Sequence, residues 1–234
     1  MTRAQARTGA AGHTVAWDDL WDSLSQGDAQ ALLAVGTVRE FRAGQAICHE
    51  HQVPDRVLII QSGRVKVSAS TASGREVVLA FRGPGELVGE QSALDDEPRS
   101  ATIVALEPVR ALALTHRDFR ALLAERPAVA LALLSMLSRR LRDADAKRIE
   151  LAVKSTLERV AGRLVELCDR FGEPSEDCVH ITLPLTQEEL SGWAGASVES
   201  VGRALHTMRE LGWIETRRRG VRVLDPDALR RAAE

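Results

Sequence analysis

Cysteine is scarce in this sequence: Cys48, Cys168 and Cys178 are the only three among 234 residues, and their spacings are unrelated. An odd number of thiols without a pattern argues against a disulfide framework and favours a reducing compartment. Three thiols also fall short of the four cysteine ligands of an all-cysteine zinc site or a four-cysteine iron–sulfur cluster. The sequence therefore predicts neither kind of centre.

Long apolar runs are also missing. The longest, Pro127–Leu137, is interrupted by Ser135 and followed by Arg139 and Arg140, whereas a membrane span needs about 20 apolar residues. Met1–Ala16 is polar and rich in Ala, Gly and Thr, without the apolar core of a signal peptide. We therefore expect a cytoplasmic protein that does not associate with a membrane.

Neither sign of charge dominates, since the sequence has 31 Lys and Arg and 33 Asp and Glu, for a net charge of −2. This balance excludes a uniformly basic nucleic-acid binder, so any nucleic-acid site must be local. The apolar share of 44% is enough to close a core, and 234 residues can form one large domain or two of ordinary size.

The first half of the chain is predicted to be mainly β. After two short amphipathic segments, Trp17–Leu24 and Asp28–Val35, the spacing changes near Gly36 to short β-rich runs divided by turn residues. Six or more strands at such close spacing favour a small barrel or roll. The predicted strands are Val38–Phe41, Arg56–Gln61, Arg64–Ser70, Glu76–Phe81, Thr102–Leu106 and Val109–Leu114.

Helical periodicity returns at His116 and is predicted to continue with little interruption to about Phe171. Alternating three- and four-residue steps, with Arg148 at the one polar position, are typical of a coiled-coil seam. The apolar positions of this seam are Leu134, Leu137, Leu141, Ala144 and Leu151. The alternative is an amphipathic helix packed on the β domain. Gly172–Asp177 is then expected to be a polar connection to a compact second segment.

One group of residues could bind an anionic ligand. Gly89 and Glu90 precede a predicted short helix, Ser92–Asp95, and Arg99-Ser100 follow it. The glycine permits close backbone approach, a helix start presents free N–H groups, and the arginine offers a fork for an anionic oxygen. Glu90 is an acceptor, which suits a sugar hydroxyl, so the group favours a nucleotide over a bare anion. The alternative is an ion pair of Arg99 with Asp95 or Glu90 across a hairpin.

A second group predicts two helices joined by a tight turn. Thr186 with Glu189 forms a capping box, Gly195-Ala196 ends that helix, and Ser197 can cap the next. Helical spacing assigns to the buried face of the second helix Val201, Ala204, Leu205 and Met208. The opposite face then carries Glu199, Gly202, Arg203 and His206. An arginine and a glutamate one turn apart can read guanine and cytosine edges, or can form a solvated ion pair.

Basic residues follow this second helix. Arg217-Arg218-Arg219 and Gly220 form a predicted hairpin tip, with Trp213-Ile214 and Val221–Leu224 as its flanking strands. Positive charge is thereby placed beside the exposed helix face. The pattern predicts a winged helix-turn-helix.

Two of these motifs resemble those of a known family. Gly89-Glu90, followed after eight residues by Arg99-Ser100-Ala101, resembles the phosphate-binding cassette of cyclic-nucleotide-binding domains. Leu185–Leu190 together with Gly195–Arg203 resembles the helix-turn-helix of the cyclic AMP receptor/fumarate-nitrate regulator (CRP/FNR) superfamily, and the likeness extends from about Trp17 to Leu224. It implies an α+β fold: a flexible tail (1–16), a cyclic-nucleotide-binding-like β-roll (17–125), a dimerisation helix (126–152) and a winged helix-turn-helix (153–234).

The resemblance further implies a homodimeric transcription regulator, not an enzyme, that binds double-stranded DNA and works with RNA polymerase. No cofactor is required, and cyclic AMP or cyclic GMP is a candidate effector. The implied effector-binding residues are Gly89, Glu90, Ser92, Arg99, Ser100, Ala144 and Asp145. The implied dimer contacts are Leu134, Leu137, Leu141 and Ala144. The implied DNA-binding residues are Thr186, Ser197, Val198, Glu199, Gly202, Arg203, His206, Arg217 and Arg219.

Two departures from the family shape the expectations. Ala144-Asp145 stands where cyclic-AMP-responding members have a Thr-Ser pair over the base. We therefore expect the phosphate cradle of Glu90 and Arg99 to form, but cyclic AMP to bind weakly or without the usual base-driven conformational switch. Val198 replaces an arginine that contacts a second guanine in other members, so base preference should shift. Alternatives are a pocket that no longer responds to an effector, and a metal- or haem-sensing regulator.

The metal alternative rests on Cys48-His49-Glu50-His51. On a strand, alternate side chains point to opposite faces, so these four could not converge on one ion. We therefore expect no metal site there.

Overall fold

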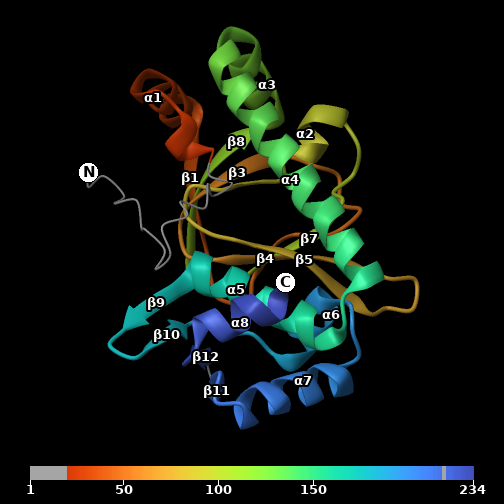
Figure 1. Cartoon of the computed structure of the whole chain (residues 1–234). Coiled ribbons are helices and arrows are strands. Elements are labelled where there is room, and N and C mark those ends of the chain that lie inside the picture. Colours follow the sequence, from red (N-terminus) through yellow and green to blue (C-terminus); the bar gives the residue numbers. More distant parts are fainter. Residues whose placement is uncertain (1–19, 218–219) are drawn as a thin grey trace.

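The computed structural model describes residues 20–217 and 220–234. A β-roll forms the N-terminal half, the helix α4 (Pro127–Val153) runs along one side of it, and a mixed α/β unit lies beyond the roll (Figure 1). The α+β class expected from the sequence is confirmed.

The β-roll consists of two four-stranded antiparallel sheets, ordered β1-β8-β3-β6 and β2-β7-β4-β5. Its strands are β1 (Thr37–Phe41), β2 (Ala46–Cys48), β3 (Arg56–Ser62), β4 (Val65–Ser70), β5 (Glu76–Arg82), β6 (Leu87–Val88), β7 (Thr102–Ala105) and β8 (Val109–Thr115). All six predicted strands are present. The two short strands, β2 and β6, were not predicted, because two or three residues carry no readable alternation.

The strand β3 shows how the roll is held together. Four successive residues of it are buried, so apolar side chains leave both faces of the strand. Leu58 and Ile60 belong to the core between the two sheets. Val57 and Ile59 belong to a second core, outside the roll, that also contains Phe119 and other residues of the covering helices. A sheet covered on both faces requires this continuous apolar run.

The helical region predicted from His116 to Phe171 is interrupted twice, each time by only one or two residues, which confirms the expectation of little interruption. It divides into α3 (His116–Glu125), α4, and α5 (Thr156–Phe171). Pro127 stands at the start of α4 and holds Arg126 out of the helical conformation, at φ −130° and ψ 83°. The second break lies at Lys154, which is extended, before a capping box formed by Ser155 and Glu158.

The remaining helices and strands complete the two halves. The described N-terminal part contains a 3-10 turn (Trp21–Ser23), α1 (Gln26–Val35) and α2 (Gln91–Asp95). The C-terminal part contains β9 (Gly172–Ser175), β10 (Cys178–Ile181), α6 (Gln187–Ala194), α7 (Val198–Glu210), β11 (Ile214–Arg217), β12 (Gly220–Val223) and α8 (Pro226–Ala233). Gly172–Asp177 is therefore not a plain connection: β9 pairs antiparallel with β10. The expected tail, 1–16, lies outside the described residues.

The C-terminal unit packs directly on the roll. Its core includes Val78 and Phe81 of β5, and the Phe81 and Trp193 rings meet edge to face at 4.9 Å. Lys66 of β4 is buried and its Nζ lies 2.7 Å from Glu189 and 3.0 Å from Glu76. A Cβ at Gly192 would lie 2.8 Å from the Glu76 carbonyl oxygen, so only glycine permits this close approach of α6 to β5.

No single helix among the described residues is long and apolar enough to cross a membrane. Helices α3 and α4 meet the length and composition test only as a pair, and they are bent by 110° at their junction.

The thiols give a first testable prediction, which concerns the half-buried Cys168. Burial, together with the charge of Asp169, raises the pKa of Cys168 from 9.0 to about 12, and burial also raises the pKa of Cys48. Because the thiolate is the reactive form, Cys168 should carry about a thousandfold less of it at pH 8 than an ordinary thiol. We expect iodoacetamide to leave Cys168 unmodified in the native protein and to alkylate it after unfolding, as peptide mass spectrometry would show. Fast alkylation of Cys168 in the native protein would contradict its position in the structure.

Candidate functional site

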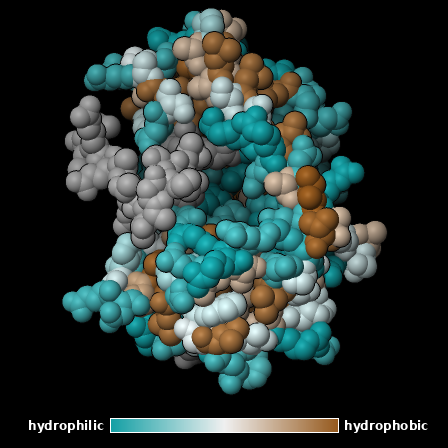
Figure 2. Space-filling model, in the orientation of Figure 1, coloured by the Kyte–Doolittle hydropathy of each residue, from teal (hydrophilic) through white to brown (hydrophobic). Residues whose placement is uncertain are grey.

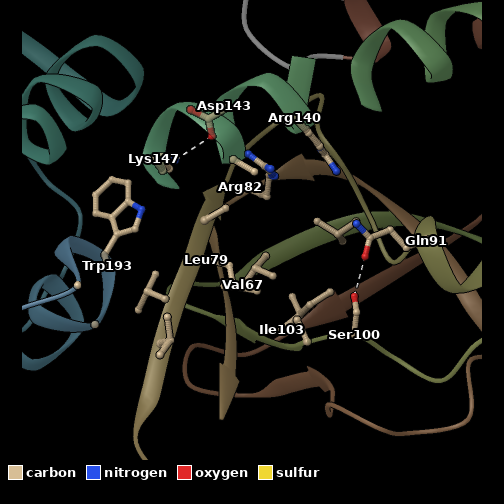
Figure 3. A pocket seen from close by; sticks show the side chains of 18 of the residues that line it. Val67, Leu79, Arg82, Gln91, Ser100, Ile103, Arg140, Asp143, Lys147 and Trp193 are labelled. Carbon is tan, nitrogen blue, oxygen red and sulfur yellow. Dashed lines mark hydrogen bonds and ion pairs between the residues drawn. The ribbon is translucent and has the colours of Figure 1, made fainter. Parts of the chain in front are cut away.

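A cavity of about 480 Å³ lies between the β-roll, α4 and α6. Strand β5 forms one wall, the segment Gly89–Ser92 and Arg99–Ala101 form one end, and Trp193–Gly195 of α6 form the other (Figure 3). Six of the seven residues predicted to bind an effector line it: Gly89, Glu90, Ser92, Arg99, Ser100 and Ala144. The structure therefore brings the predicted cradle residues together around an open space.

Gly89 and Arg99 depend on each other. Gly89 has φ +78°, a conformation that side chains disfavour, and a Cβ there would lie 2.6 Å from a terminal nitrogen of Arg99. The Arg99 guanidinium donates to the carbonyl oxygens of Gly89 at 2.9 Å and Arg56 at 2.5 Å. Asp55 lies 3.4 Å away as its carboxylate partner. Arg99 is thus buried and held in one position by backbone oxygens.

Arg99 also sets the charge state of its neighbours. Burial alone would raise the pKa of Asp55, but the hydrogen bond and charge of Arg56, with the charge of Arg99, hold that pKa below its usual value. Burial and the charges of Arg99 and Arg120 lower the pKa of His116. His116 is therefore mainly neutral at pH 7 and adds no second positive charge near Arg99.

Glu90 is engaged by α4 rather than by Arg99. It is 4% exposed, and its Oε1 lies 2.7 Å from Arg140, which also donates to the Leu87 carbonyl oxygen at 2.9 Å. The alternative interpretation, an ion pair of Arg99 with Asp95 or Glu90, differs from the structure, in which Arg99 pairs with Asp55 and Glu90 with Arg140. The Glu90–Arg140 pair links the cradle to α4.

The polar rim of the cradle is also defined. Ser100 Oγ donates to Gln91 Oε1 at 2.7 Å, and the two side chains face each other in the cavity (Figure 3). Of the two residues predicted to lie over the base, Ala144 lines the cavity. Asp145 is exposed on α4 and is not among the lining residues of its own chain, so its contact with a base stays a prediction.

The helix-turn-helix forms as its caps predict. Thr186 and Ser197 accept hydrogen bonds from the backbone N–H of Glu189 and Ser200, both at 3.1 Å. Gly195 ends α6 in the left-handed conformation, at φ 61°. The predicted inner face of α7 is buried: Val201, Ala204, Leu205 and Met208.

The outer face of α7 is open, at the edge of the molecule beside β11 and β12 (Figure 1). Val198, Glu199, Arg203 and His206 are exposed on it, and Gly202 is half-buried. Arg203 forms an ion pair with Glu199 and donates to Ser200 Oγ at 2.9 Å. Without DNA, these side chains form the solvated ion pair that was the alternative to base contact.

The wing lies next to this face. β11 and β12 pair antiparallel, with Arg217 opposite Gly220. Arg217 is exposed, with Glu215 at 3.5 Å. Arg219 lies outside the described residues.

Comparison with known proteins agrees with this geometry. A family model of the cyclic nucleotide-binding domain matches residues 38–126, and one of the Crp-like helix-turn-helix domain matches residues 158–232. The "CRP-like cAMP-activated global transcriptional regulator" of Mycobacterium tuberculosis H37Rv is 34% identical over 194 residues, 83% of this chain and 87% of that protein. This chain belongs to the CRP/FNR superfamily.

Other relatives agree. The "Cyclic AMP receptor protein" of Thermus thermophilus is 34% identical over 82% of this chain and 86% of that protein. FixK2 from Bradyrhizobium japonicum, at 22% identity, shares the fold with a TM-score of 0.74 over 86% of this chain and 98% of that structure. The CRP/FNR chain is accordingly a DNA-binding transcription regulator and not an enzyme.

Several cavity residues of this CRP/FNR regulator were not predicted from the sequence. They are basic or aromatic and come from β5, α4, α5 and α6: Arg82, Arg140, Lys147, Arg148, Arg159, Arg163 and Trp193. Steps of seven and eight residues align Arg140, Lys147 and Arg148 along α4, a spacing that could have indicated one face. The residues of α5 and α6 carry no such signal, because packing of the two halves brings them to the cavity.

The expected seam on α4 is divided between two faces. Leu134 and Leu141 are 61% and 64% exposed. Leu137, in contrast, is half-buried against the core of its own roll, and Ala144 faces the cavity. Figure 2 shows hydrophobic surface along the side of the molecule on which α4 lies. Leu134 and Leu141 are thus the predicted contacts that remain open for a second copy.

The segment Cys48–His51 differs from the strand assumed for it. β2 ends at Cys48, which is buried, and His51 has φ 66° in the turn that follows. Glu50 accepts from the backbone N–H of Ser70 at 2.8 Å. The argument from strand faces therefore does not apply, and among the described residues no three His, Cys, Asp or Glu side chains are arranged to hold a metal ion.

Proposed function

We propose that this CRP/FNR regulator is a homodimer whose binding to a two-fold-related DNA site is controlled by a cyclic nucleotide in the cavity. One observation carries the proposal: the same cavity is lined by the Gly89–Arg99 cradle, by α4 and by Trp193–Gly195 of the helix-turn-helix. A ligand there touches the sensing domain, the helix between the domains and the DNA-binding domain together. Its free energy of binding can therefore depend on their arrangement.

The cradle suits a cyclic phosphate and a ribose. Arg99 supplies a fixed, buried cation for the phosphate, and Ser100 supplies a hydroxyl donor at the rim. Glu90 has one oxygen engaged by Arg140, and its other oxygen can accept from a sugar hydroxyl. Ala144 offers the base no hydrogen bond. We therefore expect this protein to select adenine less strongly than relatives that are named as cAMP-activated.

At the DNA, Glu199 and Arg203 read base edges, with Val198, Gly202 and His206 on the same face, while Thr186, Ser197 and the wing residues Arg217 and Arg219 contact phosphates. A dimer places two copies of α7 about one turn of DNA apart, roughly 34 Å. RNA polymerase is the further partner that the family resemblance implies.

Titration calorimetry with cyclic AMP and cyclic GMP tests the effector. We expect saturable binding of at least one nucleotide to the full chain, and a loss of 100-fold or more in Arg99→Gln, because charge-assisted hydrogen bonds contribute roughly 1.5–3 kcal/mol each. Arg120→Gln is the matched control, since Arg120 pairs with Asp96 outside the cavity. The control should bind as the native protein does.

DNA binding by the same proteins is then measured. A site is selected from a random duplex pool with and without the bound nucleotide. An effector-controlled regulator should select a two-fold-related site with nucleotide-dependent affinity. Selection of the same site with equal affinity in both conditions, together with no nucleotide binding, would identify a pocket that no longer responds to an effector.

A further inference from the structure

We propose that Lys66 and Arg75 of the sensing β-roll are positioning residues for DNA binding, because they hold the two ends of α6 and so fix the helix-turn-helix against the roll. The inference rests on the proposed function, in which the helix-turn-helix binds DNA. It adds a contribution to DNA affinity that comes from the sensing domain itself and needs no effector.

The first contact is at the start of α6. The side chain of Lys66, on β4, is only 10% exposed, and its Nζ donates to Glu189 Oε1 at 2.7 Å. The other oxygen of Glu189 accepts from the backbone N–H of Thr186 at 2.9 Å and from the Thr186 hydroxyl at 3.1 Å. One carboxylate therefore joins the β-roll to Thr186, the residue that the proposed function assigns to a DNA phosphate.

The charges at this contact depend on Lys66. Glu76 of β5 is the second carboxylate on Lys66, at 3.0 Å, so two carboxylates share one ammonium group. Ser68 donates to the other oxygen of Glu76 at 2.6 Å. Burial alone would raise the pKa of Glu76, but the hydrogen bonds from Ser68 and Lys66 hold that pKa below its ordinary value, so Glu76 stays charged. Without Lys66, two negative charges would face each other in a partly buried contact, which opposes the packing of α6 on the roll.

The second contact is at the end of α6. Arg75, which immediately precedes β5, donates to the Ala196 carbonyl oxygen at 2.5 Å. Ala196 in turn immediately precedes Ser197, the N-cap of α7. Carbonyl groups at the end of a helix carry partial negative charge, so a cation there is favourable. The guanidinium group of Arg75 therefore fixes the turn that leads into α7.

Between these two ends, the backbones of α6 and β5 lie close together (Figure 1). Gly192 leaves no room for a side chain against the Glu76 carbonyl oxygen. The hairpin of β4 and β5 thus contacts α6 at its start, middle and end. Thr186, Ser197 and Arg203 remain exposed. The contacts therefore hold the helix-turn-helix without covering the surface that faces DNA.

Fixing the helix-turn-helix matters because two copies of α7 must reach two half-sites at once. Order that is present before binding does not have to be imposed by the DNA, so it increases affinity. With the contacts of Lys66 and Arg75 lost, rotation about Lys154, the extended residue between α4 and α5, would give the helix-turn-helix more orientations. Fewer molecules would then present both copies of α7 correctly.

Fluorescence anisotropy with the selected DNA duplex, in the absence of nucleotide, tests the inference. We expect Lys66→Met to weaken binding about tenfold and Arg75→Met about threefold. The slope of log affinity against log salt should not change in Lys66→Met, because a buried residue that touches no phosphate releases no counterions. Lys66→Met with Glu189→Gln should recover part of the loss. The second substitution removes the unpaired charge, while the glutamine can still accept from Thr186.

Arg126→Met is the matched control, because the partner of Arg126 is Asp28, at 3.2 Å within the same half of the chain. It should bind DNA as the native protein does. Hydrogen exchange followed by mass spectrometry shows directly whether α6 is released. Amides of α6 should exchange faster in both test variants than in the native chain, and amides of α3, in the N-terminal half, should not. Thermal melting shows that each variant is folded.

Native DNA affinity and native exchange of α6 in both test variants would overturn the inference. Stronger DNA binding would overturn it as well, because the packed arrangement would then oppose DNA binding. If the variants lose DNA affinity but no cyclic nucleotide binds the native chain, the proposed effector control fails while the positioning role stands. If the native chain selects no DNA site, the proposed function fails, and this inference with it.

Discussion

A protein carrying Arg203→Ala is expected to bind its selected DNA site hardly better than a random duplex. Arg203 has a side chain that is 65% exposed on the outer face of α7, with no partner in the core. A bidentate arginine–guanine contact contributes roughly 1–3 kcal/mol of discrimination, about 5- to 150-fold, and a dimer makes it twice. Because Arg203 lies on the surface, its removal should leave the free energy of unfolding within about 0.5 kcal/mol of native.

Fluorescence anisotropy with a specific and a scrambled duplex measures this discrimination. Arg217→Ala is the matched control, because it removes the same charge from the wing rather than from α7. It should weaken binding to both duplexes alike and reduce the slope of log affinity against log salt by about 1 for each protomer's phosphate contact. Discrimination that survives Arg203→Ala would mean that a different face of α7 meets the bases.

The helix-turn-helix could be predicted because its determinants are local. Thr186 and Glu189 are three residues apart, and Ser197 caps the helix that begins at the next residue. Their hydrogen bonds form within one helical turn, whatever the rest of the chain does. The buried face of α7 follows from helical spacing in the same way, and the structure confirms both.

The cradle was predictable in part. Gly89 and Arg99 were identified from their types and spacing, and they do meet. The partners of the cradle were not: Glu90 pairs with Arg140, which is 50 residues away in the sequence. Nothing in the local pattern specifies which cation of α4 reaches a given carboxylate, since that depends on how α4 crosses the roll.

The packing of the two halves against each other could not be predicted from the sequence. Lys66 and Glu189 are 123 residues apart, and each by itself has the pattern of an ordinary surface residue. In the structure they form a partly buried ion pair. Burial alone would lower the pKa of Lys66, but its hydrogen bonds to Glu189 and Glu76 hold that pKa above its ordinary value. Gly192 likewise shows no special role until β5 is placed against α6. The far end of the cavity exists only because of this contact.

The helix α4 shows that the residues of one sequence pattern can lie against different neighbours. The predicted seam has the right period, but a helix of 27 residues presents several faces to different neighbours. Leu137 is used by the core of its own roll and Ala144 by the cavity, so only part of the seam is left. The exposed row includes Leu131, which the pattern did not include, at 64% exposure.

A protein with Leu141→Glu is expected to be a monomer at micromolar concentration. In the structure Leu131, Leu134 and Leu141 expose apolar surface on one side of α4. A second copy packed on this side would bury it, in the manner of a two-stranded coiled coil. Around a two-fold axis, the substitution would place two carboxylates near each other in a desolvated interface, which costs several kcal/mol and is enough to separate a micromolar dimer.

Sedimentation equilibrium measures the outcome, with Val53→Glu as the control. Val53 is also exposed and apolar, at 81%, but it lies in the loop before β3, away from α4. Both variants add one negative charge to an exposed position, so a general effect of charge would move them equally. Thermal melting separates a folded monomer from an unfolded chain. Since each α7 contacts one half-site, the monomer should also lose the two-fold DNA site while keeping weak binding to single half-sites. A Leu141→Glu protein that remains dimeric would place the interface on another surface of the molecule.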